Sequence, residues 1–527
     1  MRPRGTKAFR QKNLDKVRFG LRSISRHRKM VFNSLSFLIF FPIVVSLYYV
    51  FPKKIQPFWL LAASYYFYMS WNAKYAILIL FSTVVTYLTG IFIGKFKFAS
   101  ENQSSKTKYA KIFVFVCFLI NLGLLFFFKY YHFFFDNLTK LFSLIGINLS
   151  SPFLDVILPV GISFYTFQAL GYCVDVYRGT IKAETNFFRY ALFVSFFPQL
   201  VAGPIERSGN LLNQLENPKP FTYNRFLEGI LLMLWGFFQK LVIADRIAIF
   251  VDKTYGDYST YPGTFLVVAT ILFSFQIYCD FGGYSNIARG AALILGIDLM
   301  NNFISPYLSK NCGEFWRRWH ISLSSWFMDY LYIPLGGNRK GKIRKYLNLI
   351  VVFGLSGLWH GANWTYIIWG LVNGIFQIIG DLLKKPKEIL YSLAGIHKNK
   401  FGTDLAKITV TYILIDFSWI FFRAKDIHHA NEIIKSIFTV FNPEILFNDA
   451  LYNCGLTRRE FSILIFSIMI LLFVDILNKK GIELRRKVLD QDYWFRVVVF
   501  CVSICFILIF GLWGTGYRSD AFLYFQF

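Results

Sequence analysis

The sequence lacks the short motifs that mark many soluble enzymes and metal sites. It has no CxxC or HExxH motif, no GxSxG nucleophile elbow and no Walker A loop. Its seven cysteines lie mostly in apolar segments, so neither a disulfide framework nor a zinc site is expected. Two histidines of interest, His320 and His360, have no carboxylate-rich cluster at ligand spacing beside them. We therefore expect no bound metal and no resident cofactor.

Acidic residues are also scarce. The chain has 30 acidic against 57 basic side chains, a formal net charge of +27. On a soluble protein such an excess would raise the question of nucleic-acid binding, but here the basic residues cluster in loops between apolar runs. Loops of this kind set topology, because the cytoplasmic loops of membrane proteins are rich in Lys and Arg. We therefore predict the lipid bilayer as a partner and no nucleic acid.

Apolar residues dominate instead, at 55% of the 527 residues, and they recur in long runs. A bilayer-spanning helix needs roughly 20 mostly apolar residues, and such runs are unlike the short alternating strands of a membrane barrel. The predicted fold class is all-α: a polytopic transmembrane helical bundle of about 11–12 spans with re-entrant helices. The runs begin near Met30, Tyr75, Ala110, Pro152, Phe187, Phe226, Thr264, Tyr346, Tyr366, Ile408, Phe461 and Phe495.

The first 29 residues differ from the rest. Eleven of them are Arg or Lys, and one, Asp15, is acidic. The stretch lacks the apolar core of a signal peptide, although a basic tail can be drawn to anionic lipid. We favour a functional start at Met30, or a dispensable tail. The predicted division is thus a basic tail at 1–29 and one membrane domain at 30–527.

Three stretches interrupt apolar runs with polar residues or helix breakers. Irregular backbone is tolerated at membrane depth only inside protein or beside a water-filled cavity. We interpret Asp175, Gln276 and Asp280, taken individually, as interhelical hydrogen-bonding groups that fix packing. The stretches are residues 161–179, residues 196–210 with Pro198, Gly203 and Pro204, and residues 275–290 with Arg289.

Basic loops predict the topology around one stretch, residues 311–364. The loop at 334–345 carries five positive charges and no acid, so it should be cytoplasmic. Residues 384–400 are also basic. Because both ends then face the same side, the segment between them, residues 346–383, is predicted to be a hairpin.

The hairpin's first arm is short. It covers the 15 residues that follow Lys345, up to His360, or about 22 Å of helix, against a hydrocarbon core of ~30 Å. We therefore predict a turn inside the membrane at residues 360–363. Glycines at 354, 357 and 361 leave room there for close helix approach.

His320 lies on the other side of the basic loop, 14 residues before Pro334. If residues 322–332 form a continuous helix, His320 lies about 21 Å from the loop, at a depth similar to that of His360. An ionisable side chain at membrane depth is costly and is a functional-site hypothesis by default. Imidazole can take a proton from a hydroxyl near neutral pH. We therefore predict that the pair is catalytic, in a reaction such as acyl transfer from a thioester.

Several of these segments carry a family resemblance. FWRRWHISLSSWFMDYLYIPLGGNRKG, followed by GLSGLWHGANW, resembles the membrane-bound O-acyltransferase family. So do FFPQLVAGPIER, GISFYTFQALGYCVDVYRG and FQIYCDFGGYSNIARG. The similarity runs from about Met30 to Phe527 and is nearest to the branch that acetylates polysaccharides such as alginate.

The resemblance implies a central funnel open to the outer face and a donor entry on the cytoplasmic face. It implies that His360 is the central catalytic histidine, acting as general base, and that His320 occupies the second polar position. The implied donor is an acyl thioester, with acetyl-CoA expected, and the implied location is the cytoplasmic (inner) membrane. Candidates for donor binding or for support of the site are Arg317, Arg318, Asp329, Trp359 and Asn363. For the basic ones, a role in topology explains the charge equally well.

The chain ends in FLYFQF, residues 522–527. This resembles the Tyr-containing C-terminal motif of members that acylate polysaccharides. By that resemblance Tyr524 is a candidate acyl relay, which would take the acyl group in the outer funnel and pass it to an extracytoplasmic partner, expected to be an SGNH-hydrolase-like acetyltransferase. The alternative is an aromatic anchor at the membrane interface.

Other activities stay open. D-alanyl transfer to teichoic acid keeps the same reaction class, and O-acetylation of peptidoglycan or cellulose is as well supported as that of alginate. A membrane transporter would also have broken helices and buried charges, although we find no inverted repeat in the sequence.

Overall fold

The computed structural model describes residues 29–98, 103–147, 158–201, 203–393, 400–513 and 522–523. Within these residues the regular structure is helical and no strand occurs. Eight helical segments are long and apolar enough to cross a membrane. The predicted all-α polytopic membrane class is thus confirmed. The eight segments are Ala73–Phe96, Lys108–Ser143, Tyr223–Gly256, Thr264–Ile294, Trp364–Leu382, Phe401–Arg423, Arg458–Lys479 and Tyr493–Phe510.

The remaining predicted runs form shorter or interrupted helices. The run near Met30 gives a helix of 16 residues, and the run near Pro152 gives one of 17. The run near Phe187 breaks at Phe196, whose ψ of 112° leaves the helical region just before Pro198. Pro198 has no backbone N–H, and its ring would clash with the preceding turn, so the preceding helix cannot continue through it; a new helix begins at Phe197 with Pro198 in its first turn. The run near Tyr346 is part of a 20-residue helix that begins with the polar sequence GKIRK.

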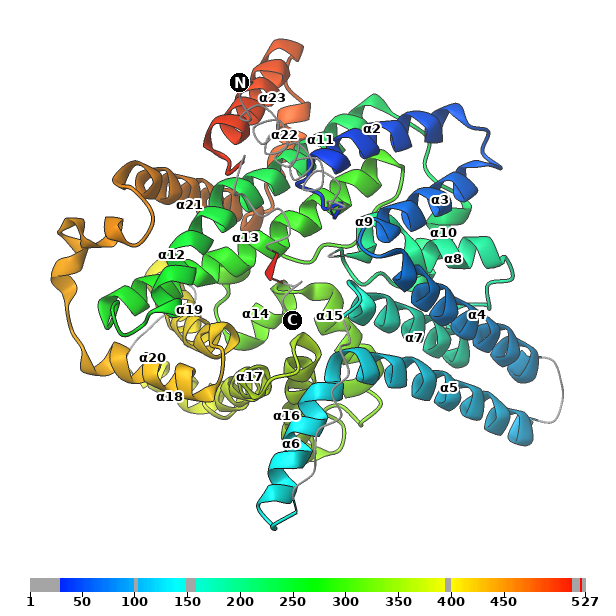
Figure 1. Cartoon of the computed structure of the whole chain (residues 1–527), viewed down its shortest axis with the longest axis horizontal. Coiled ribbons are helices and arrows are strands. Elements are labelled where there is room, and N and C mark those ends of the chain that lie inside the picture. The colour runs from blue at the N-terminus through cyan, green and yellow to red at the C-terminus, as the bar shows by residue number, and fades with distance from the viewer. Residues whose placement is uncertain are drawn as a thin grey trace, which may run out of the picture.

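The N-terminal helices lie on one side of the molecule (Figure 1). A π-helical segment, Phe126–Tyr130, joins α5 to α6. The helices are α2 (Leu35–Val50), α3 (Gln56–Met69), α4 (Ala76–Phe98), α5 (Gln103–Leu125), α6 (Tyr131–Ser143), α7 (Ile162–Arg178), α8 (Phe187–Ser195), α9 (Phe197–Leu200) and α10 (Ser208–Glu216).

The longest helix, α13 (Thr264–Ile294), crosses the middle of the molecule (Figure 1). It packs along α11 (Tyr223–Phe237) and α12 (Asp245–Gly256), which a π segment, Phe238–Ala244, connects. The two helices approach closely at glycines. A Cβ on Gly236 would lie 2.5 Å from the carbonyl oxygen of Gly283, so α11 and α13 touch through their backbones.

The central part of the chain folds beside α13. It contains α14 (Cys312–Arg318), α15 (Ile321–Phe327), a π segment at Met328–Tyr332, α16 (Gly341–His360) and α17 (Trp364–Leu382). The helix predicted over residues 322–332 is therefore continuous, with a π turn in its second half. The chain continues with α18 (Lys384–Leu393), α19 (Phe401–Arg423), α20 (Ile427–Thr439), α21 (Arg458–Lys479), α22 (Leu484–Leu489) and α23 (Tyr493–Phe510).

Helices α16 and α17 form the predicted hairpin, with its turn at residues 361–363. Glycine permits the contact, because a Cβ on Gly357 would lie 2.1 Å from the carbonyl oxygen of Tyr366. The hairpin and its turn are thus confirmed, and the depth of the turn in a bilayer stays a prediction.

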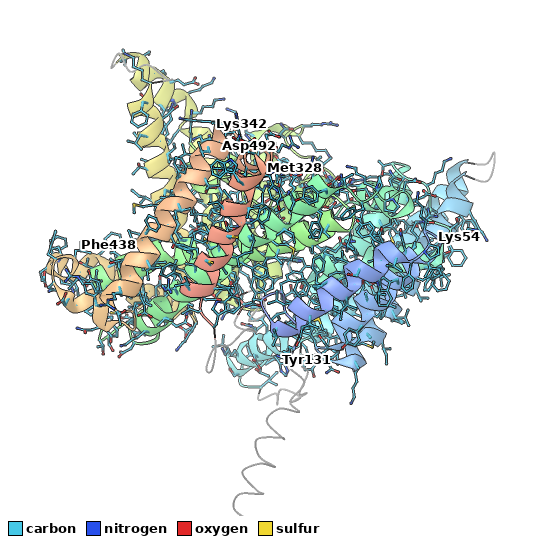
Figure 2. All side chains as sticks on the ribbon, turned by 90° about the horizontal axis from the view of Figure 1, so that it is seen from above. Lys54, Tyr131, Met328, Lys342, Phe438 and Asp492 are labelled. Carbon is cyan, nitrogen blue, oxygen red and sulfur yellow. The ribbon has the colours of Figure 1, made fainter. Side chains whose placement is uncertain are left out.

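Two basic regions share one face of the molecule. Figure 2 shows Lys342, in the first turn of α16, and Asp492, which follows the basic segment 479–487, at the same face of the molecule, while Tyr131 lies at the opposite face. A common face for basic loops is what the positive-inside rule requires. We call the side that bears Lys342 the basic face.

The chain is packed into the core from Met30 onward. Residues Met30 to Asn33 are buried, and the Trp71 indole donates a hydrogen bond to the Met30 carbonyl oxygen at 3.0 Å. The predicted basic tail lies outside the described residues, except for Lys29.

Candidate active site

His360 is the last residue of α16 and is almost fully buried. Three aromatic side chains surround its ring, with centroids 5.0 to 5.4 Å away: Trp359, Trp369 of α17 and Phe422 of α19. Three helices thus converge on this imidazole. Close packing of this kind fixes a side chain in one orientation, which a catalytic base requires.

His320 sits at the N-cap position of α15 with a left-handed backbone, φ 44° and ψ 54°. This conformation costs a non-glycine residue roughly 1–2 kcal/mol, so the surroundings must enforce it. The neighbouring segment does so through paired backbone hydrogen bonds. The Ile321 amide donates to the Asn302 carbonyl oxygen, and the Ile304 amide donates to that of Arg318, each at 3.0 Å. Strained backbone held in this way clusters at functional sites.

The structure brings the two histidines together. Their ring centroids lie 6.2 Å apart, and Trp359 lies beside both, 5.9 Å from His320. Phe281 of α13 packs against the His320 ring at 4.6 Å. The two imidazoles are therefore direct neighbours within an aromatic chamber, and their depth in a bilayer stays a prediction.

The end of α16 is held by the α5–α6 junction. Lys129 Nζ donates to the carbonyl oxygens of Trp359, at 2.6 Å, and of His360, at 3.3 Å. The Tyr130 hydroxyl donates to the carbonyl oxygen of Leu358 at 3.0 Å. The last carbonyls of a helix have no partner within the helix and carry partial negative charge, so a cation there is favourable.

Our sequence analysis missed Lys129, although a signal was present. The residue stands alone within the apolar run FFFKYY, and an ionisable side chain in such a run is a functional-site hypothesis. It also lies in a π-helical segment, a feature frequent at functional sites.

A pocket adjoins His360 at this junction. It is lined by Lys129, Ser163, Phe164, Trp359 and His360, together with the loop 158–161. Tyr131, next to this junction, lies at the face opposite Lys342 (Figure 2). The pocket therefore approaches His360 from the side away from the basic face. Its lysine and serine are polar groups able to orient a hydroxyl compound.

Asp329 lies apart from the histidines, nine residues beyond His320 or about 14 Å along the helix. It pairs with Arg207 at 2.6 Å, and its carbonyl oxygen accepts from Arg178 at 2.8 Å. Both guanidinium groups also lie over the ring of Tyr330, 4.8 and 5.3 Å from its centroid. This network fastens α7, the α9–α10 loop and the π segment near the basic face.

Of the remaining candidates, one lies beside the histidines and the others lie elsewhere. Trp359 belongs to the histidine chamber, whereas Arg317 is exposed and Arg318 pairs with Glu314 at 2.9 Å. The Asn363 side chain caps α17 by accepting from Thr365, and it donates to the carbonyl oxygen of Lys425 at 2.8 Å. Asn363 thus holds the turn that follows His360.

Two of the polar residues interpreted as packing groups do bridge helices. Asp175 accepts from the Tyr330 hydroxyl at 2.8 Å and from Ser208 at 2.6 Å. Asp280 of α13 pairs with Lys240 at 2.5 Å. Among the described residues, no group of three metal-ligating side chains occurs.

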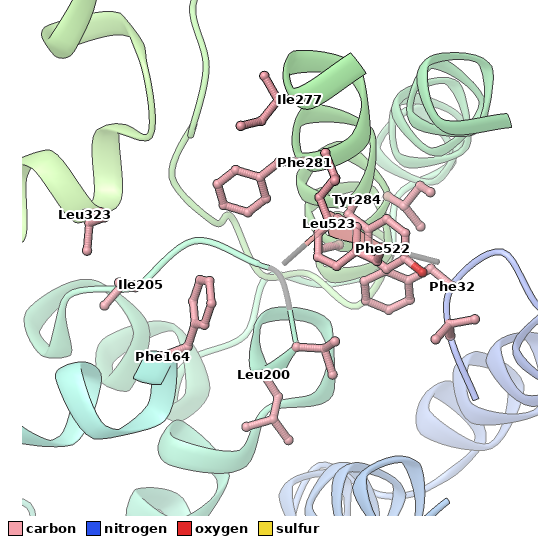
Figure 3. Packing of buried hydrophobic residues seen from close by; sticks show 14 of the residues in the cluster. Phe32, Phe164, Leu200, Ile205, Ile277, Phe281, Tyr284, Leu323, Phe522 and Leu523 are labelled. Atoms are coloured by element: carbon pink, nitrogen blue, oxygen red, sulfur yellow. The ribbon is translucent and has the colours of Figure 1, made fainter. Parts of the chain in front are cut away.

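Tyr524 lies outside the described residues, but the two residues before it are described. Phe522 and Leu523 are buried against Phe281 and Tyr284 of α13, as Figure 3 shows. Phe281 is the residue that also packs on His320. Residues 522–523 therefore lie close to the histidine chamber.

The fold and the site together define a polytopic helical membrane protein with two imidazoles buried at its centre. The model of the MBOAT, or membrane-bound O-acyltransferase, family matches residues 181–385, which include both histidines.

Curated relatives are similar to this chain over more of its length than the family model. The probable alginate O-acetylase of Pseudomonas syringae pv. tomato is 37% identical over 78% of this chain and 75% of its own length. The peptidoglycan O-acetyltransferase of Helicobacter pylori is 33% identical over 96% of this chain and 99% of its own length. The teichoic acid D-alanyltransferase of Bacillus subtilis is 29% identical over 51% of this chain and 70% of its own length. The chain belongs to the membrane-bound O-acyltransferase family and is an O-acyltransferase.

Proposed function

We propose that this O-acyltransferase takes an acetyl group from a cytoplasmic thioester, acetyl-CoA, and delivers it across the inner membrane for O-acetylation of an envelope polysaccharide. The observation that carries the proposal is the buried pair of imidazoles, 6.2 Å apart between their ring centroids. Helix α16 leads from the basic face to His360, and the Lys129 pocket reaches His360 from the other side. Such an arrangement suits a donor and an acceptor that arrive from opposite faces.

The proposed chemistry is general-base acyl transfer. The imidazole of His360 removes the proton from an acceptor hydroxyl, whose oxygen attacks the thioester carbonyl carbon. The C–O bond forms, the C–S bond breaks, and the leaving thiolate takes the proton back from the imidazolium to give free CoA. His320 orients or polarises the reacting group, supported by Trp359 in the same chamber.

We propose Tyr524 as the first acceptor. A phenol, with a pKa near 10, is a better leaving group than a sugar hydroxyl, so a phenyl ester retains enough reactivity to pass its acetyl group on. The recipient would be an extracytoplasmic SGNH-hydrolase-like acetyltransferase, which completes transfer to the polymer. The described residues 522–523 support this role, because they lie beside Phe281 and thus near His320.

Two acceptor polymers fit the relatives. Alginate is supported by several alginate O-acetylases at 35–38% identity. Peptidoglycan is supported by a relative that matches 96% of this chain. D-alanyl transfer to teichoic acid has weaker support, since the relatives of that kind match about half of the chain.

The test uses sealed inside-out vesicles that contain the protein and its envelope partner. Acetyl-CoA labelled in the acetyl group is supplied at the exposed cytoplasmic face, and label is followed into polymer in the lumen. We expect labelled polymer in parent vesicles and none with His360→Ala, at equal protein levels. Uptake of intact labelled acetyl-CoA, without label on polymer, would instead indicate a transporter.

A further inference from the structure

Three ionised side chains form a buried cluster that the proposed chemistry does not use. Lys240 lies in the π segment that connects α11 and α12, and its side chain is 1% exposed. Its Nζ atom pairs with Asp245 at 2.8 Å and with Asp280 of α13 at 2.5 Å. Buried charges are expensive unless they are paired and hydrogen-bonded. Further hydrogen-bond donors to these carboxylates are therefore favourable.

The end of the chain supplies such a donor. The Leu523 amide donates to Asp280 Oδ2 at 2.8 Å, while Asp280 Oδ1 faces Lys240. Hydrogen bonds from backbone amides to carboxylates are among the stronger ones in proteins. This contact joins residues 243 positions apart in the chain.

An aromatic contact accompanies the hydrogen bond. Phe522 is fully buried and stacks on Tyr284, one helical turn beyond Asp280, with ring centroids 4.3 Å apart. Lys240 Nζ lies 5.7 Å from the centroids of both rings. The chain end is thus held at two adjacent points, one through its backbone and one through its side chain.

The same stretch of α13 also reaches the histidines. Phe281 directly follows Asp280, and its ring lies 4.6 Å from that of His320. Tyr524 directly follows Leu523 in the sequence. A residue bonded to an anchored neighbour has a raised effective concentration near the anchor.

We propose that Asp280, Lys240 and Tyr284 form a docking site for the chain's own C-terminal segment, and that this site positions Tyr524 for acylation. The three are positioning residues and take no part in the bond changes. The positioning of Tyr524 rests on its proposed relay role, whereas the docking of residues 522–523 does not.

Docking is tested by thiol labelling at the chain end. In Leu523→Cys the amide donor remains, so the new thiol stays buried and reacts slowly with maleimide. Mass spectrometry of the C-terminal peptide separates this thiol from the seven native cysteines. Adding Asp280→Asn or Phe522→Ala should raise the labelling rate about tenfold or more, since a charged hydrogen bond or a buried ring contact is lost.

The labelling test includes a control variant and a variant that changes only the C-terminal segment. Asp252→Asn is the matched control, because it removes the carboxylate of the Arg423 ion pair on the exposed surface and should leave the rate unchanged. Phe522→Ala alters only the chain end, so it decides the matter where Asp280→Asn disturbs folding. Equal labelling rates in Leu523→Cys alone and in its Phe522→Ala combination would overturn the docking site.

Positioning is tested by following acetyl label on Tyr524. Phe522→Ala should lower the initial rate of Tyr524 acetylation about tenfold, yet a peptide of sequence AFLYFQF supplied in solution should still be acetylated through His360. Loss of both reactions would overturn the positioning role. If Tyr524 is never acetylated in the parent protein, the relay itself is wrong, and the labelling rates still decide the docking site.

Discussion

The rings of His320 and His360 lie 6.2 Å apart, yet the two residues are held in place by different means. His320 is fixed through a left-handed backbone that paired hydrogen bonds enforce. His360 is fixed at a helix end whose carbonyl oxygens accept from Lys129. The separation therefore depends on two independent supports, and each can be removed without touching the other.

Two substitutions of His320 distinguish the stability cost of its left-handed backbone from the catalytic contribution of its imidazole. A glycine tolerates φ near 44° without penalty, whereas alanine pays the cost of the left-handed region. We expect His320→Gly to be more stable than His320→Ala by about 1 kcal/mol, and both to lose acyl transfer. Denaturant unfolding in detergent and transfer of acetyl label measure the two quantities. Full activity of His320→Gly would remove the imidazole from the proposed mechanism.

Replacing Lys129 tests the support of His360. Lys129→Met deletes the donor to two carbonyl oxygens and leaves them in an apolar setting, so acyl transfer should fall about tenfold or more. Lys129→Arg keeps the positive charge and should retain more activity than Lys129→Met. Lys140→Met, an exposed lysine on α6, is the control and should behave as the parent. Equal activity of Lys129→Met and the parent would contradict this role.

The hairpin contact between α16 and α17 can be tested with two glycines on the same helix. A Cβ on Gly357 would lie 2.1 Å from the Tyr366 carbonyl oxygen, so Gly357→Ala forces the helices apart at a cost of about 1–3 kcal/mol. A Cβ on Gly354 would meet only the flexible side chain of Leu371, at 3.4 Å. Thermal unfolding should therefore show a lower midpoint for Gly357→Ala than for Gly354→Ala. Equal midpoints would mean that the hairpin tolerates a wider separation.

Asn302 tests the segment that holds His320. Its side chain accepts from the Ser322 amide at 3.4 Å and donates to Ser285 at 3.2 Å. Asn302→Ala removes both bonds and should cost about 1–3 kcal/mol of stability, because buried groups lose their partners. We also expect a larger relative loss of acyl transfer than in Gly357→Ala, since the change lies next to His320. An unaltered rate of transfer would show that backbone contacts alone hold this residue.

Much of this architecture followed from the sequence. Long apolar runs predicted the membrane class, the basic loops predicted the α16–α17 hairpin, and the short first arm predicted a turn at residues 360–363. These features depend on local composition and on helix geometry, which a single sequence displays. A similar depth for His320 and His360 was predicted by counting both from the same basic loop. Their proximity is what the fold adds, because equal depth alone does not bring two helices together.

Contacts between segments far apart in the chain could not be predicted from the sequence. The pairing of Lys129 with the end of α16 joins residues 230 positions apart, and nothing in local composition selects that partner. The Asp280–Leu523 contact is of the same kind. Asp329 was a candidate for donor binding or for support of the site, but it pairs with Arg207, about 14 Å along the helix from His320. A single sequence does not show which distant side chain such a residue meets.

The role of His360 is tested by measuring acyl transfer with purified protein. Purified protein is supplied with acetyl-CoA and the peptide AFLYFQF, and release of the CoA thiol is recorded together with acetyl label on the peptide. We predict coupled thiol release and labelling in the parent, and a loss of about a hundredfold or more of both in His360→Ala, with an unchanged elution profile in detergent. Transfer at the parental rate by His360→Ala would mean that this imidazole is not the general base.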